Sequence, residues 1–420
     1  MKRGRILAVA LLLLLAFAAG GFWMTRAMRL VDVKHDSAVP VSNAQIERGA
    51  YLARAGNCAA CHTTRGGKPY AGGEGVATPF GTVYPSNITS DPEHGIGRWS
   101  AGDFWRAMHH GQSRDGRLLY PAFPYPDYTH VSREDSDALY AFLQSVPAAA
   151  QPNQAHALRF PYNTQGALVA WRTLFFSPGE YRPDARQTAE WNRGAYLVQG
   201  LGHCMACHAP RNAWGATSSE PDFSGGLIPM QRWYAPSLSA PGEAGVQAWS
   251  LDEVVQLLRD GHSPKGSTLG PMAGVVAGST QHLDEADLRA MGRYLQSLPR
   301  VDVQAPEGTH AEPQVLAMGE RLYSKQCASC HGEQGQSEKP GFPSLAGSRA
   351  VTTASSANLV QTILHGGYAP TTRGNPAPYG MPPFAQDLND EQIAAVASYV
   401  RSAWGHRSGR VTPLDVQKLR

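Results

Sequence analysis

One short pattern, two cysteines separated by two residues and followed directly by a histidine, occurs three times in this chain of 420 residues. The copies are Cys58–Cys61–His62, Cys204–Cys207–His208 and Cys327–Cys330–His331, which together use all six cysteines. The pattern is that of c-type haem attachment, in which each thiol forms a thioether to a haem vinyl group and the histidine becomes the proximal iron ligand. The sequence therefore predicts three covalently bound haem c groups.

Other uses of paired cysteines fit this spacing less well. Structural zinc prefers four Cys or His ligands, often from two neighbouring pairs, whereas the pairs here lie more than 100 residues apart. A thioredoxin-like redox pair needs a βαβ context, which is seen around none of the three. A disulfide within each pair leaves the following histidine unexplained.

The sequence around the motifs also repeats. A short helix is expected to run into each motif, a middle helix ends at Gly111, Gly261 and Gly366, and an amphipathic helix closes each segment, starting near Ser132, Leu283 and Leu388. We therefore predict an all-α fold of three consecutive cytochrome c-like domains, each wrapped around one haem, at residues 42–150, 185–300 and 312–405. A C-terminal tail at 406–420 follows.

The N-terminus predicts export. Three basic residues precede an apolar run of 19 residues, 6–24, which is close to the length that spans a bilayer as a helix. Residues 1–30 fit either a cleaved signal peptide or a retained membrane anchor. Both interpretations place the remainder on the periplasmic side of a bacterial inner membrane, where c-type haem is attached. The net charge of +3 gives no indication of a nucleic-acid partner.

A methionine in the loop before the last helix is expected to supply the sixth iron ligand. Met272 follows Gly261 by 11 residues, and Met381 follows Gly366 by 15. Neighbouring prolines stiffen both loops. Histidine and methionine together raise the haem potential and close the iron to other ligands, which suits electron transfer.

The first segment differs, because Phe123 occupies the position of the methionine, 12 residues after Gly111. A phenyl ring cannot ligate iron. The candidates for the sixth ligand are His130, His109 and His110, and an iron with no sixth protein ligand is the alternative. We therefore hypothesise that the first haem has different ligation, and hence a different potential, from the other two.

One apolar stretch, Leu168–Phe176, lies between the first two segments in a region expected to be a linker. It is either a contact surface for a partner subunit or the membrane, or a segment that packs against its own domains.

The chain resembles the membrane-bound three-haem cytochrome c subunits of bacterial dehydrogenases, those that oxidise alcohol, gluconate, sorbitol or aldehyde. The resemblance rests on residues 48–52, 87–89, 91–92, 95–99, 119–122, 381–384, 388, 390–393 and 399–401. It implies a separate catalytic subunit with a molybdenum, quinone or flavin cofactor, with or without a small iron–sulfur subunit. Electrons would pass through the three haems to ubiquinone or a terminal oxidase.

The resemblance also bears on the partner. Family members with alcohol or gluconate partners typically have methionine where Phe123 stands, and the Tyr-Pro-Ala-Phe-Pro-Tyr version of residues 120–125 is commoner beside molybdenum-containing aldehyde or heteroaromatic dehydrogenases. The resemblance thus favours a molybdenum-type partner.

No motif indicates substrate chemistry in this chain itself, since phosphate-binding glycine loops, catalytic triads and zincin motifs are not found. Two other classes of function stay open. The chain could be a haem enzyme or sensor with an open first haem, or the cytochrome subunit of an oxidase complex.

Overall fold

The computed structural model describes residues 21, 29–31, 33, 41–218, 220–301, 310–337 and 341–420. These residues form two compact units. The first unit contains the chain up to Ala50 and Cys61–Tyr181, and the second contains Tyr51–Ala60 and Arg182–Arg420. The predicted signal or anchor at 1–30 lies almost entirely outside the described residues. Among the helices that are described, none combines the length and apolar character needed to cross a bilayer.

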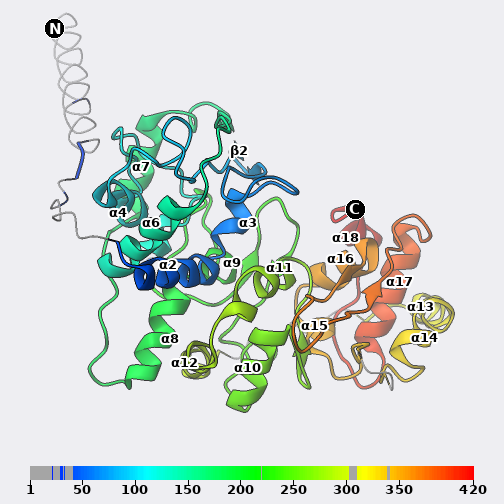
Figure 1. Ribbon diagram of the computed structural model, residues 1–420. Coiled ribbons are helices and arrows are strands. Elements are labelled where there is room, and N and C mark those ends of the chain that lie inside the picture. The colour runs from blue at the N-terminus through cyan, green and yellow to red at the C-terminus, as the bar shows by residue number, and fades with distance from the viewer. Residues whose placement is uncertain are drawn as a thin grey trace, which may run out of the picture. The chain divides into compact units, whose positions relative to one another are not determined.

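The first unit is mainly helical, with one small sheet (Figure 1). Its helices are α2 (Asn43–Ala55), α3 (Cys58–His62), α4 (Ala101–His110), α5 (Tyr125–Tyr128), α6 (Arg133–Ser145) and α7 (Gln165–Phe175). Residues 51–60, which include the end of α2 and the start of α3, belong to the second unit. The strands β1 (Val76–Thr78), β2 (Gly81–Val83) and β3 (Ala157–Leu158) form an antiparallel sheet in that order, with Thr82 opposite both Ala77 and Ala157.

The second unit carries the second and third haem motifs. Its helices are α8 (Ala189–Gln199), α9 (Met205–His208), α10 (Leu251–Asp260), α11 (Pro271–Gly278), η1 (Thr280–His282), α12 (Glu285–Gln296), α13 (Pro313–Gln326), α14 (Ala328–His331), α15 (Arg349–Thr352), α16 (Ala357–His365), α17 (Asp390–Ser402) and α18 (Pro413–Gln417). Its two-residue strands pair as β4 (Gly226–Leu227) with β5 (Tyr234–Ala235), β6 (His262–Ser263) with β7 (Gly266–Ser267), and β8 (Gly367–Tyr368) with β9 (Gly380–Met381).

Local sequence sets the middle helices. Ser100 and Ser250 each begin a helix with a capping box, in which the serine side chain and an acidic residue three positions later exchange hydrogen bonds with the backbone. Gly111 and Gly261 end these helices in the left-handed conformation. Both ends lie at the residues that the repeat predicts. The middle helix α16 likewise ends before Gly366.

The helix before each motif crosses the last helix of its segment at a glycine. A Cβ added to any of these glycines would collide with a backbone carbonyl oxygen on the partner helix, so only glycine permits the close approach. The pairs are Gly49 with Ala138, Gly194 with Ala290, and Gly319 with Ala395. This crossing is one helical arrangement repeated three times.

Ion pairs accompany the first two crossings. Arg48 binds Asp135 in the first unit, and Arg193 binds both carboxylate oxygens of Asp287 in the second, each at 2.7 Å. Tyr51 adds a 2.7 Å hydrogen bond to Asp287. Because Tyr51 belongs to the end of α2, this bond helps to hold residues 51–60 in the second unit.

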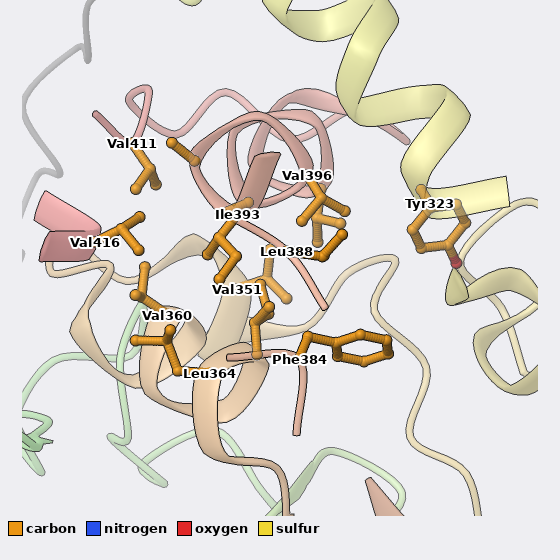
Figure 2. Packing of buried hydrophobic residues seen from close by; sticks show 14 of the residues in the cluster. Tyr323, Val351, Val360, Leu364, Phe384, Leu388, Ile393, Val396, Val411 and Val416 are labelled. Atoms are coloured by element: carbon orange, nitrogen blue, oxygen red, sulfur yellow. The ribbon is translucent and has the colours of Figure 1, made fainter. Parts of the chain in front are cut away.

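The core around α17 shows how the last part of the chain is packed (Figure 2). Ile393 on α17 and Val360 and Leu364 on α16 are completely buried. Val416 on α18 is also completely buried in this cluster. The predicted tail at 406–420 is therefore part of this core, because its Val416 covers the apolar face of α16 and α17.

Two features of the fold were not expected from the sequence. The short strands escape pattern analysis because two or three residues are too few to show a period of two. The stretch 165–175 is the helix α7, whose Leu168 and Val169 are buried against Leu118. The self-packing interpretation is therefore correct for these two residues, while Leu174 is 68% exposed.

Candidate haem-binding sites

The three motif histidines share one hydrogen-bonding arrangement. Each imidazole places Nδ1 against a backbone carbonyl oxygen from a loop that follows its motif. His62 faces Ser86 at 2.6 Å, His208 faces Pro236 at 2.8 Å, and His331 faces Pro343 at 2.8 Å. A carbonyl can only accept, so Nδ1 carries the proton and Nε2 is left as the metal-binding atom. Such a bond to the second nitrogen is usual for histidines that ligate metals.

The protonation state of these histidines also suits iron binding. Desolvation lowers the pKa of His62, His208 and His331, and the carbonyl bonds offset this only in part. Neutral imidazole is the form that binds a metal. The lowered pKa values therefore favour the ligand state at neutral pH.

Every motif has its two thiols beside the histidine on a short helix. Cys58 begins α3, Cys204 precedes α9 and Cys327 precedes α14, so each second cysteine follows about one turn later. No disulfide joins any of these six cysteines. Burial raises the pKa of Cys61, and it raises that of Cys327 to about 11. Two thiols and one free Nε2 on one turn are the donor set for covalent haem c, so the residues fit this cofactor.

The two predicted methionine ligands lie in different settings. Met272, expected in a loop, is the second residue of α11, where Pro271 starts the helix. Met381 is on β9, opposite Gly367 on β8, and packs against the core around α17. Both side chains are half-buried. Their ligation stays a prediction.

The first segment places Phe123 and the three candidate histidines around α4 and α5. Phe123 packs against Tyr128, with ring centroids 5.3 Å apart. His109 is buried and stacks on Trp105, with ring centroids 4.3 Å apart. Its Nδ1 lies 3.4 Å from the Thr129 hydroxyl oxygen. His109 thus has both a stacking partner and a hydrogen-bonding partner inside the unit.

The other two candidates differ in their surroundings. His110 packs edge-on against His109, and desolvation, followed by nearby positive charges, lowers its pKa to about 4. His130 directs Nδ1 to the Asp127 carbonyl at 3.0 Å. The sixth ligand of the first haem, either one of these three histidines or none from the protein, stays a prediction.

Sequence reasoning missed the groups that orient the histidines. Ser86, Pro236 and Pro343 act through backbone carbonyls, which carry no residue-specific signal. The ion pair between Arg193 and Asp287 could have been found, because Arg48 and Asp135 occupy the same places in the first repeat. Matched opposite charges in two aligned repeats are a signal of contact.

Comparisons with known proteins agree with this chemistry. The sequence model of the cytochrome c family matches residues 46–147 and 316–404, which contain the first and third motifs. The chain is 39% identical over 396 residues to the cytochrome c subunit of the quinone alcohol dehydrogenase of Gluconacetobacter polyoxogenes, covering 90% of this chain and 84% of that protein. It is 38% identical over 397 residues to the gluconate 2-dehydrogenase cytochrome c subunit of Pantoea cypripedii, covering 90% of each.

A third relative is much longer than this chain. It is a subunit of the nicotinate dehydrogenase of Pseudomonas putida, and it is 44% identical over 368 residues, which are 86% of this chain and 30% of that protein. The similarity therefore concerns one part of that longer polypeptide.

Proposed function

Because the chain belongs to the cytochrome c subunits of dehydrogenase complexes, we propose that it is a three-haem electron-transfer subunit. It carries electrons from a catalytic dehydrogenase subunit to ubiquinone or a terminal oxidase. One observation carries the proposal. A short helix with the Cys-x-x-Cys-His pattern occurs three times, and each time the histidine Nδ1–H donates a hydrogen bond to a backbone carbonyl. When bound, haem iron supplies reversible one-electron exchange.

The residues of this chain hold and orient that cofactor. The cysteines fix it covalently, and the carbonyls of Ser86, Pro236 and Pro343 set the tautomer and orientation of the histidines. Met272 and Met381 serve as the sixth ligands at the second and third sites. Phe123 leaves the first site with a different axial set.

The location and the partner are parts of the same proposal. The basic and apolar N-terminal segment supports a site of action on the periplasmic side of the inner membrane, as an anchored or peripheral protein. The 44% identity to part of a nicotinate dehydrogenase, together with Phe123, supports a partner that oxidises an aldehyde or a heteroaromatic compound and belongs to the molybdenum class.

The number of haems is tested by intact mass and pyridine haemochrome measurements on chain made in a bacterium that attaches haem c. We expect three haems per chain, and two when Cys204 and Cys207 are both replaced by alanine. Wild-type protein with two haems would contradict the proposal.

The first site is tested by adding carbon monoxide to the reduced protein. Phe123→Met should add a methionine ligand there, so any carbon monoxide binding seen in the wild type should decrease in this variant. A wild-type spectrum with three equivalent His/Met haems would contradict the difference between sites.

The partner is tested by tagging this chain in its native host and isolating the membrane complex. We expect a large dehydrogenase subunit to co-purify and its substrate to reduce the haems of the tagged chain. Co-purification with oxidase subunits alone would favour the oxidase-complex alternative.

A further inference from the structure

A buried carboxylate lies beside the loop that orients His208. Glu243, in the turn before α10, is only 5% exposed. Its Oε2 accepts a 2.7 Å hydrogen bond from the Ser237 backbone N–H and a 3.0 Å bond from the Tyr234 hydroxyl, which also reaches Oε1 at 3.2 Å. A carboxylate buried in this way requires such donors, because it has lost its contact with water.

The Ser237 N–H belongs to the same peptide group as the Pro236 carbonyl, which accepts from His208 Nδ1 at 2.8 Å. One peptide group therefore connects the imidazole on one side with the carboxylate on the other. Hydrogen bonds in such a chain polarise one another, so the negative charge makes the carbonyl a stronger acceptor. A stronger acceptor at Nδ1 makes Nε2 a more basic ligand.

The first site has the same arrangement, except that the group which accepts from the peptide N–H is neutral. The Ser86 carbonyl accepts from His62 at 2.6 Å, and the N–H of the same peptide, that of Asn87, donates to the Asn153 side-chain oxygen at 2.7 Å. Glu93 aligns with Glu243, because each stands seven residues before the serine that starts the middle helix of its repeat, and Glu93 is exposed. The group that accepts from this peptide N–H is therefore a buried carboxylate at the second site and a neutral amide at the first.

A purely structural role, in which Glu243 only shapes its turn, accounts for fewer of these contacts than a role toward His208. The turn has its own backbone bonds, from the Ala244 N–H to the Ser237 carbonyl at 3.0 Å and from Gly245 to Ala240 at 2.9 Å. Arg349 adds a positive charge nearby through the carbonyls of Pro241 and Gly245. That cation contacts the outer residues of the turn, whereas Glu243 bonds directly to the peptide that holds the histidine.

We propose that Glu243 lowers the reduction potential of the second haem through the Pro236–Ser237 peptide, an inference that rests on the proposed binding of haem at His208. The oxidised haem iron carries one more positive charge than the reduced form, so a nearby negative charge stabilises the oxidised form. A more basic proximal histidine acts in the same direction.

The expected effect is a change of about tenfold in the electron-transfer equilibrium, which corresponds to about 59 mV for one electron. This is the scale of a unit charge at about 10 Å with an effective dielectric constant of about 20. Glu243→Gln keeps the acceptor oxygen and removes the charge, while Glu243→Asp retains the charge.

The experiment is a spectroscopic redox titration of the full haem-loaded chain. We expect Glu243→Gln to raise one of the three midpoint potentials and Glu243→Asp to leave it close to the wild-type value. Asn153→Asp adds a charge at the equivalent hydrogen-bonded place and should lower a different midpoint, by a smaller amount, because Asn153 is exposed and water screens its charge. In a chain without the second haem, with Cys204 and Cys207 replaced by alanine, Glu243→Gln should shift neither remaining midpoint.

Three unchanged midpoints in a fully loaded Glu243→Gln protein would overturn the inference, as would a downward shift. If the Glu243→Gln protein lacks its second haem, the test is the midpoint potential of the first haem in the Asn153→Asp protein. The absence of a downward shift there overturns the inference. Fewer than three haems in the wild type is a different result, which contradicts the proposed function instead.

Discussion

Replacing Gly194 by alanine tests the helix crossing that recurs in all three segments. Gly194 lies on α8 where this helix meets α12, and an added Cβ would collide with the carbonyl oxygen and carbon of Ala290. These contacts fall far inside 3.0 Å, a limit that real Cβ atoms essentially never pass. Both atoms belong to the backbone, so no side chain can rotate away to make room, and the helices must separate.

The size of the effect follows from two opposing contributions. Overpacking in a tight core costs about 1–3 kcal/mol, and a collision with backbone belongs at the upper end. Alanine recovers up to about 1 kcal/mol through its higher helix propensity. The net loss is about 2 kcal/mol. For a unit of this size a loss of 1 kcal/mol lowers Tm by about 2–4 °C, so we expect a decrease of about 4–8 °C.

The measurement is thermal unfolding of the haem-loaded chain, followed by circular dichroism. Gly179→Ala is the matched control, because an added Cβ meets nothing within 4 Å there, and it should leave Tm unchanged. A Gly194→Ala protein that melts at or above the wild-type temperature would refute the close crossing of α8 and α12.

Three other substitutions test the packing and the ligands. Asp287→Asn removes the charge to which Arg193 and Tyr51 both bond, and it should lower the free energy of unfolding in urea by about 1–3 kcal/mol. An unchanged urea concentration at half-unfolding would show that this network is dispensable. Arg401→Met removes three bonds to backbone carbonyls from a side chain in a residue only 3% exposed, and should cost a similar amount in the same assay, while exposed Arg410→Met should cost nothing. Met381→Ala should let the reduced protein bind carbon monoxide at one more haem, whereas Met318→Ala on α13 should not.

Local features of the fold could be predicted because they depend on residues close together in the chain. Ser100 and Ser250 start helices through hydrogen bonds within one turn, and Gly111 ends α4 because glycine adopts the left-handed conformation without steric cost. Met272 was expected in a loop but lies in α11, since the sequence did not separate a loop proline from one that begins a helix. The burial of Val416 could not be predicted, because it depends on helices far away in the sequence.

The sequence by itself determined the chemistry of the three motifs, since thiols and an imidazole at fixed spacing on one turn can attach and ligate haem c wherever that turn lies. Only the tertiary structure decided how each histidine is oriented, because its acceptor is a backbone carbonyl that any residue could provide. The tertiary structure also buried Glu243 and left the aligned Glu93 exposed. Both glutamates occupy the same place in their repeats, but burial depends on long-range packing, and burial gives a charge its strength.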